Sequence, residues 1–168
     1  QKYILLSAHR EENIDTDRNF VQLFTAVNAM AEKYDMPILY SCHPRSRKRL
    51  EATGFQLDTR VIAHEPLGFL DYNCLQMNAF AVVSDSGTLP EESSFFLSVG
   101  KPFPAVSIRT STERPEALDA GCFVLAGIDA DSLLQAVEMA VGMQRAECFG
   151  TPVAGYTAEN VSMKVARI

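Results

Sequence analysis

Residues 79 to 97 read AFAVVSDSGTLPEESSFFL, and this stretch decides the fold. The apolar run from Ala79 to Ser84 is typical of a strand that is covered on both faces of a sheet. The small polar turn Asp85-Ser86-Gly87 follows, and a helix is expected from about Leu89 to Leu97. A strand that leads through a tight turn into a helix is the unit from which open parallel α/β sheets are built.

The same alternation of strand and helix extends over the rest of the chain. Further strands are expected over residues 2–8, 36–42, 61–63, 103–108 and 122–125, and further helices over residues 16–34, 45–53, 70–78 and 131–144. In the helix over 16–34, apolar side chains recur on one face, and Thr16 suits the N-cap. Gly54 suits the end of the helix over 45–53, and Asp131 or Ser132 the start of the last helix. The prediction is one α/β domain over residues 1–168 with an open parallel sheet.

Composition excludes several classes of function. The net charge of −6 argues against a nucleic-acid partner, whose binding surface would be basic. No apolar run approaches the ~20 residues that cross a bilayer, and no basic and apolar leader opens the chain, so we expect a cytoplasmic protein without a membrane partner. Because Gln1 leads almost directly into a strand, we expect a domain cut from a longer protein.

The cysteines do not form a metal or redox motif. Their spacing is wide and includes no CxxC pair, so we interpret them as buried, reduced thiols. They are Cys42, Cys74, Cys122 and Cys148. With no other cluster of His, Cys or Asp at metal-ligand spacing, we predict no metal. The sequence also lacks GxGxxG and GxxxxGK[ST], which argues against a dinucleotide site and a Walker-type ATP site.

Two stretches at expected strand ends carry candidate site residues. In Ser7 to Asn13, His9 suits phosphate contact or proton transfer, and Arg10 is a second donor. A solvated loop with a capping histidine explains this stretch as well. In Ser84 to Thr88, a small-residue turn opens a helix, and that geometry directs backbone N–H groups and a positive dipole end at an anion.

The residues of that turn suggest a nucleotide site. Ser86 and Thr88 add hydroxyl groups, and Gly87 allows close approach of a ligand to the backbone. Glu92, one turn into the helix, suits a pair of ribose hydroxyls. A helix that simply carries acids in its first turn explains the same residues.

Two further stretches carry weaker signals. In Thr112 to Glu116, Arg114 offers a planar fork for a diphosphate or a carboxylate, although a surface Glu–Arg pair before a helix is equally open. The loop within 63–75 suits backbone contacts and an aromatic wall for a base, although anchoring of the loop in the core is the plainer explanation. His43 and His64 are interpreted as packing or loop residues.

Taken together and in this order, the motifs resemble a known family. His9-Arg10-Glu11-Glu12-Asn13 is similar to the His-Arg-Arg-Glu-Asn signature of hydrolysing UDP-N-acetylglucosamine 2-epimerases. Asp85-Ser86-Gly87 with Glu91-Glu92 resembles that family's Asp-Ser-Gly-Gly-x-x-Glu-Glu. Gly100-Lys101-Pro102 and the run from Thr112 to Ala117 are also similar. The likeness extends from Tyr3 to about residue 165.

The resemblance implies the second half of a GT-B fold, in which two Rossmann-like domains face each other across a cleft. It implies a UDP-N-acetylhexosamine substrate, or UDP, as ligand, and a full-length homodimer whose N-terminal domain is absent here. Residues from about 150 onward are then a tail or helix that returns to that domain. The family needs no metal or redox cofactor: UDP is eliminated across C1–C2 to give a 2-acetamidoglycal and is added back with C2 inverted. Proton removal at C2 is assigned to carboxylates of the missing half.

Site residues carry over from the family one by one. His9 matches the active-site histidine, and Ser86 and Gly87 match the turn that holds the diphosphate. Glu92 matches the ribose-binding glutamate, and Arg114 matches the substrate-site arginine.

Departures from the family pattern leave the substrate and the branch of the family open. Glu11 replaces the second Arg of the first signature, and Thr88 replaces the second Gly of the turn. Leu67 replaces a glutamine of the uracil loop, and Tyr72 replaces a nearby phenylalanine. The same departures resemble capsule and O-antigen enzymes that form UDP-N-acetyl-L-fucosamine from UDP-N-acetyl-L-pneumosamine, while Gly100-Lys101-Pro102 resembles the general family.

Two rival functions stay open at this point. One is a GT-B glycosyltransferase, whose second half also binds a UDP-sugar with a strand, a turn and a ribose glutamate. The His9 loop together with Thr112 to Ala117 favours the epimerase. The other is a non-catalytic module that binds a UDP-sugar.

Overall fold

The core of the molecule is a sheet of parallel strands. The computed structural model describes residues 2–109 and 111–167. Within them the strands are β1 (Ile4–Ser7), β2 (Ile38–Ser41), β3 (Val61–His64), β4 (Ala81–Ser84), β5 (Ala105–Ile108) and β6 (Val124–Ala126). They lie in the order β3-β2-β1-β4-β5-β6, and each neighbouring pair is parallel. The predicted open parallel α/β sheet is confirmed, and its order is that of a Rossmann-type doubly wound fold.

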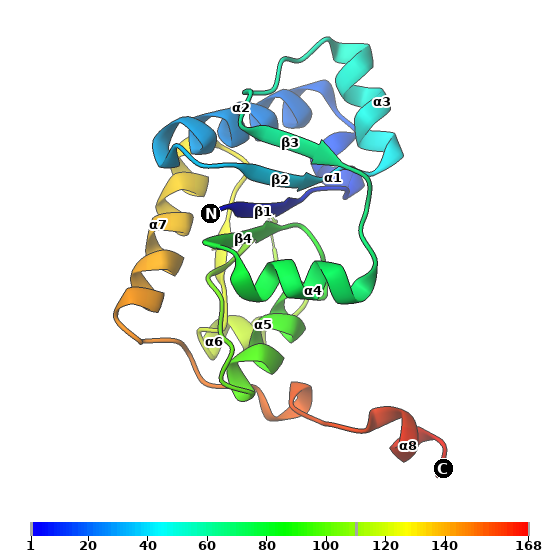
Figure 1. Cartoon of the computed structure of the whole chain (residues 1–168), viewed down its shortest axis with the longest axis vertical. Coiled ribbons are helices and arrows are strands. Elements are labelled where there is room, and N and C mark those ends of the chain that lie inside the picture. Colours follow the sequence, from blue (N-terminus) through cyan, green and yellow to red (C-terminus); the bar gives the residue numbers. More distant parts are fainter. Residues whose placement is uncertain (1, 110, 168) are drawn as a thin grey trace.

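Helices cover both faces of the sheet. They are α1 (Glu11–Ile14), α2 (Asp17–Tyr34), α3 (Pro44–Thr53), α4 (Phe69–Asn78), α5 (Leu89–Ser98), α6 (Pro115–Asp119), α7 (Ala130–Arg145) and α8 (Val161–Val165), with a 3₁₀ turn, η1 (Ala154–Tyr156). Helices α2 and α7 are far apart in the sequence but lie side by side on one face (Figure 1). Helices α4, α5 and α6 contribute to the apolar cluster on the other face.

The alternation of side chains along each strand divides the core into two clusters. In β1, Ile4 and Leu6 join the cluster under α2 and α7, whereas Leu5 joins the cluster under α4 to α6. The apolar face predicted for the first long helix is buried as expected: Phe20, Phe24, Val27 and Ala31 are all inaccessible to solvent. This two-sided burial explains why the strands read as continuous apolar runs.

The helix ends lie at the capping residues predicted from the sequence, with one exception. The Thr16 side chain accepts a hydrogen bond from the Asn19 amide, and Gly54 ends α3 at a φ of 64°, as predicted. The prediction for α7 is wrong, because the cap is Asp129, which accepts from the amide of Ser132. Helix α1 was expected to be loop; four residues are too few to show helical periodicity in a sequence.

The burial of the cysteines differs from the prediction. All four are free, but only Cys42 is buried. Cys122 is half-buried, and Cys74 and Cys148 are exposed, so the interpretation as buried thiols is wrong for these two. Cys74 lies on α4, a helix that buries only Gln76 completely, so position within a helix did not imply burial.

The order in which successive strands are added to the sheet reverses between β1 and β4, although all strands run parallel. From β1 the chain moves outward through β2 to β3, and from β4 it moves the other way through β5 to β6. The last residues of the two central strands, Ser7 and Ser84, are register partners. Ligands of open α/β sheets bind outside the carboxyl ends of the strands at such a switch point.

The C-terminal segment extends away from the sheet. Helix α8 lies at the far end of this segment (Figure 1). Val161, Met163 and Val165 on it are each more than half exposed. No helix in residues 2–109 and 111–167 combines the length and apolar character needed to span a membrane.

Candidate functional site

A buried carboxylate connects the two loops at the switch point. Asp85 directly follows β4 and is inaccessible to solvent. Its Oδ2 atom accepts hydrogen bonds from the amides of His9 (2.9 Å) and Arg10 (2.8 Å) and from the Asn13 side chain (3.2 Å). The Asn13 amide group also donates to the Ile108 carbonyl (3.1 Å), so the ends of β1, β4 and β5 are tied together.

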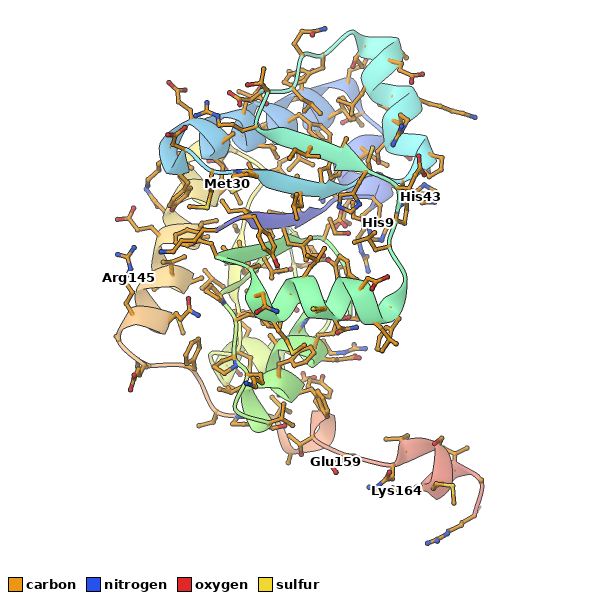
Figure 2. The ribbon with its side chains drawn as sticks, viewed as in Figure 1. His9, Met30, His43, Arg145, Glu159 and Lys164 are labelled. Carbon is orange, nitrogen blue, oxygen red and sulfur yellow. The ribbon has the colours of Figure 1, made fainter. Side chains whose placement is uncertain are left out.

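His9 stands at this edge with its ring half-exposed. Its Nδ1 atom lies 3.2 Å from Asp85 Oδ1, and 47% of the side chain is accessible to solvent. Figure 2 labels His9 beside the end of β1, with His43 at the same edge of the sheet. The sequence predicted His9 at a strand end, and the structure places it beside Asp85, whose role the sequence did not reveal.

The turn after β4 leaves one backbone amide for a ligand. The Ser86 amide donates to Ser84 Oγ (3.0 Å), and the Thr88 amide donates to Ser86 Oγ (3.3 Å). The Ser86 and Thr88 hydroxyls also bond each other at 3.0 Å. Within the described residues the Gly87 amide donates no hydrogen bond. The turn therefore offers fewer free amides than expected, and Gly87 is the one that remains.

Two guanidinium groups lie over Gly87. A Cβ at this position would lie 3.1 Å from Arg10 Nη2 and 3.8 Å from Arg109 Nη1. Glu113 Oε1 accepts from Arg109 Nη2 at 3.0 Å and lies 3.8 Å from Arg10 Nη1, so it holds the two cations side by side. The hydrogen bond from Arg109 lowers the pKa of the Glu113 carboxyl, and the charges of Arg109 and Arg10 lower it further.

Arg109 is a site residue that sequence reasoning missed. Its side chain is only 8% exposed, and its Nε atom, 3.6 Å from Glu12 Oε1, has no aligned acceptor among the described residues. A buried cation with spare donors, beside a glycine whose amide donates no hydrogen bond within the described residues, is suited to an anion. The available signal was its position directly after β5, the same position that Asp85 holds after β4; His9 lies one residue further from the end of β1.

Glu92 is held on both of its oxygens. Oε1 accepts from Thr88 Oγ1 and Oε2 accepts from Gln76 Nε2, each at 2.7 Å. Gln76 is buried, which makes the second contact a fixed one. Because each carboxylate oxygen can accept a second hydrogen bond, the clamped group still has acceptor capacity for a ligand diol.

The Tyr72 hydroxyl is close to the same carboxylate. Burial raises the pKa of Tyr72 to about 12, the charge of Glu92 contributes to the increase, and hydrogen bonding with Ser7 and Ser84 opposes it. The ring is half-buried and belongs to the cluster under α4 to α6. Tyr72 therefore stays a neutral hydroxyl donor near the switch point at physiological pH.

Arg114 lies at the margin of this group. Its Nε donates to Glu91 Oε1 at 2.7 Å, and Nη1 donates to the Glu113 carbonyl at 3.1 Å. The hydrogen bond to Glu91 raises the pKa of Arg114. The guanidiniums beside Gly87 are those of Arg10 and Arg109, not that of Arg114. Through its bond to Glu91, Arg114 instead connects the Thr112–Glu116 stretch to α5.

The other histidines have structural contacts, as predicted. His43 caps α3, where its Nδ1 accepts from the Arg45 amide at 3.4 Å. His64 Nδ1 lies 2.7 Å from the Glu65 carbonyl oxygen. Among the described residues, no three His, Cys, Asp or Glu side chains are placed to hold a metal ion.

Two hollows border the site. A hollow of about 440 Å³ beside β1 is lined by His9, Arg10, Glu11, Glu12 and Arg45. A groove of about 540 Å³ runs between α4, α5 and the C-terminal segment, and its walls are mainly apolar. Glu91 and Glu92 lie at the edge of this groove, while Phe69 and Leu70 on its wall are about four-fifths exposed, at 77% and 80%.

Comparison with known proteins points to one family. Residues 1–168 match the family described as UDP-N-acetylglucosamine 2-epimerase. The UDP-N-acetylglucosamine 2-epimerase of Methanococcus maripaludis is 38% identical over 142 residues, which are 82% of this chain and 37% of that protein. The UDP-2,3-diacetamido-2,3-dideoxy-D-glucuronate 2-epimerase of Pseudomonas aeruginosa is 31% identical over 140 residues, 83% of this chain and 37% of that protein.

A solved structure gives the same result for the fold. The UDP-GlcNAc 2-epimerase of Methanocaldococcus jannaschii, in complex with UDP-GlcNAc and UDP, superposes with a TM-score of 0.81 at 29% identity. The alignment covers 99% of this chain and 46% of that chain. This chain therefore spans less than half the length of the proteins that it matches.

Proposed function

Because this chain belongs to the UDP-N-acetylglucosamine 2-epimerase family, we propose that it is the nucleotide-binding half of a UDP-N-acetylhexosamine 2-epimerase. The observation that carries the proposal is the cluster at the β1/β4 switch point, where Gly87, Arg10 and Arg109 adjoin the clamped Glu92. A cation pair beside an open backbone amide suits a diphosphate, and a fixed carboxylate suits a ribose diol. The rival glycosyltransferase is less well supported, because the family match spans the whole chain.

The diphosphate is proposed to bind over Gly87. The free amide of Gly87 and the two guanidiniums meet there, and Ser86, the preceding residue, is proposed to add its hydroxyl. Glu113 pairs with both guanidiniums and offsets part of their charge, and the diphosphate would take over part of that pairing. Arg114, held by Glu91, supports the same loop and is proposed to reach the substrate from the margin.

The nucleoside is proposed to bind beside α4 and α5. Glu92 accepts hydrogen bonds from the ribose hydroxyls while Thr88 and Gln76 keep its carboxylate in place. Tyr72, half-buried next to Glu92, closes the base side of this site with its ring and its neutral hydroxyl. As the sequence suggested, backbone groups of the 63–75 loop are proposed to contact the base.

The reaction requires stabilisation of charge on the departing UDP. As the C1–O bond breaks, negative charge grows on the diphosphate, and elimination removes the C2 proton to give the 2-acetamidoglycal. Donors already aimed at the diphosphate stabilise this charge without reorganisation. We propose that His9, with hydrogen on both ring nitrogens, donates from Nε2 to the bridging oxygen, and that the base at C2 belongs to a part of the enzyme outside this chain.

The C-terminal segment is proposed to connect the two halves of the enzyme. Helix α8 exposes Val161, Met163 and Val165 and lies away from the sheet (Figure 2, beyond the labelled Glu159). Apolar side chains on an extended segment are stabilised when another surface covers them. We propose that residues from about 150 return to an N-terminal domain, that the full enzyme is a cytoplasmic homodimer, and that it supplies precursors of surface polysaccharide. The narrower UDP-N-acetyl-L-fucosamine branch stays a prediction.

The proposal is tested with the longer protein that contains this chain, incubated with UDP-N-acetylglucosamine in D₂O. Elimination and re-addition exchange the C2 hydrogen with solvent, so both the starting sugar nucleotide and its 2-epimer should acquire deuterium at C2. Proton NMR follows the loss of the C2 signal. Turnover that yields UDP and a glycoside, without C2 exchange, would identify a glycosyltransferase instead.

The same assay tests whether a metal takes part. We expect EDTA to leave the rate unchanged, because guanidinium and backbone donors can neutralise the leaving diphosphate. A rate that collapses in EDTA and returns with a divalent ion would contradict this expectation.

A further inference from the structure

We propose that Asp85 is a positioning residue that fixes the tautomer and the orientation of His9. The sequence suggested no role for this carboxylate, and none of the substrate contacts proposed above involves it. Asp85 is inaccessible to solvent, so it is placed to act through His9 rather than on a ligand.

The two oxygens of Asp85 have different tasks. Oδ2 accepts from three donors, the amides of His9 and Arg10 and the Asn13 side chain. Oδ1 has no aligned donor among the described residues, although His9 Nδ1 lies only 3.2 Å away. A buried carboxylate oxygen without a donor is costly, and a small rotation of the half-exposed ring would supply one. The carboxylate thus holds the loop with one oxygen and faces the imidazole with the other.

An ionised carboxylate can only accept hydrogen bonds. Of the two neutral imidazole tautomers, only the one with hydrogen on Nδ1 can satisfy Oδ1. The other tautomer would place the Nδ1 lone pair against Oδ1 at 3.2 Å, which is repulsive. Asp85 therefore selects the Nδ1–H form of His9 and leaves Nε2 for a ligand in the hollow that His9 lines.

The backbone contacts make an amide substitution diagnostic. In Asp85→Asn the single amide oxygen is required at the Oδ2 position, where three donors converge. The new NH₂ group then occupies the Oδ1 position and donates to His9 Nδ1. This reverses the selection, because Nδ1 must now accept and the hydrogen moves to Nε2. The loop contacts stay intact while the tautomer changes.

The other histidines provide internal references for the measurement. His43 Nδ1 accepts from a backbone amide, so His43 must carry its hydrogen on Nε2. His64 Nδ1 lies against a carbonyl oxygen, so His64 must carry its hydrogen on Nδ1. The chain contains only three histidines, and nitrogen-15 labelling of these residues gives a spectrum in which His9→Gln identifies the His9 signals.

The experiment records nitrogen-15 NMR spectra of the imidazoles in the whole chain, at a pH above the point where the signals stop changing. We expect wild-type His9 to match the His64 pattern and His9 in Asp85→Asn to match the His43 pattern. Wild-type His9 with hydrogen on Nε2 would overturn the proposal, and so would an unchanged tautomer in a folded Asp85→Asn chain. If Asp85→Asn does not fold, the wild-type spectrum alone still decides.

Asn13→Ala is the matched structural control. It removes one of the three donors to Oδ2 and leaves Oδ1 facing His9. We expect a lower melting temperature with the Nδ1–H tautomer retained. Loss of that tautomer in folded Asn13→Ala would mean that general integrity of the loop, and not Oδ1, controls the ring.

The kinetic consequence rests on the proposed function, whereas the tautomer does not. In the longer protein we expect Asp85→Asn to lower kcat by about a hundredfold or more with little change in KM. His9 can donate from Nε2 while facing Asp85 only when both ring nitrogens carry hydrogen, and an NH₂ group at the Oδ1 position opposes the hydrogen on Nδ1. The expected tautomer change with normal kcat would leave the positioning role intact and would contradict the catalytic role proposed for His9.

Discussion

His9→Asn in the longer protein should lower kcat for epimerisation by about a hundredfold or more and leave KM nearly unchanged. The ring stands at the switch point, with Asp85 behind Nδ1 and the hollow on its open side. A donor aimed at the departing diphosphate contributes mainly in the transition state, where the charge is greatest. Its removal therefore reduces kcat and not substrate binding.

The measurement is kcat, KM and melting temperature of His9→Asn and of His64→Asn. His64 is a second histidine at a strand end, with its Nδ1 against the Glu65 carbonyl, so its loss should lower the melting temperature and leave kcat close to normal. If His9→Asn keeps a near-normal kcat and loses stability instead, His9 only anchors the loop and the catalytic assignment is wrong.

Glu92→Gln should weaken UDP binding by about tenfold or more. The substitution keeps the size of the side chain and removes its charge, and a hydrogen bond to a charged group contributes about 1.5–3 kcal/mol. The contacts from Thr88 and Gln76 show that both carboxylate oxygens serve as acceptors, whereas an amide has one acceptor oxygen. Calorimetric titration with UDP measures the change.

Glu91→Gln is the matched control for Glu92→Gln. Glu91 is the neighbouring acid on the same helix, but it accepts from Arg114 at the margin of the site. We expect its amide variant to bind UDP within about threefold of wild type. Equal losses in both variants would show that the negative charge at the start of α5, rather than the Glu92 carboxylate, matters for binding.

The fold could be predicted from the sequence because the central strands β1, β4 and β5 are buried on both faces. The apolar runs of β1 and β4 and the periodic face of α2 identify their elements without knowledge of the tertiary structure. Capping was predictable where a single residue decides it, as at Thr16 and Gly54. Helix α1 was missed because it is only four residues long, and the cap at Asp129 was missed because Asp131 and Ser132, which follow closely, are equally suitable cap residues.

The site was predictable only in part, because its decisive contacts join distant parts of the chain. The sequence indicated His9 and the 84–88 turn from their positions at strand ends. The hydrogen bonds from His9 and Arg10 to Asp85 span 76 and 75 residues, and sequence spacing cannot reveal such pairs. Arg109 was overlooked because a lone cation after a strand resembles any surface residue until its burial is known.

The most direct test of the central claim, that this chain is the nucleotide-binding half of a 2-epimerase, is calorimetry of the isolated chain with UDP. We predict weak, saturable binding at one site, reduced by Glu92→Gln, and no epimerisation of UDP-N-acetylglucosamine by the chain alone, since the base at C2 is proposed to lie outside it. Absence of saturable UDP binding by the folded wild-type chain, or sustained epimerisation without a second domain, would contradict it.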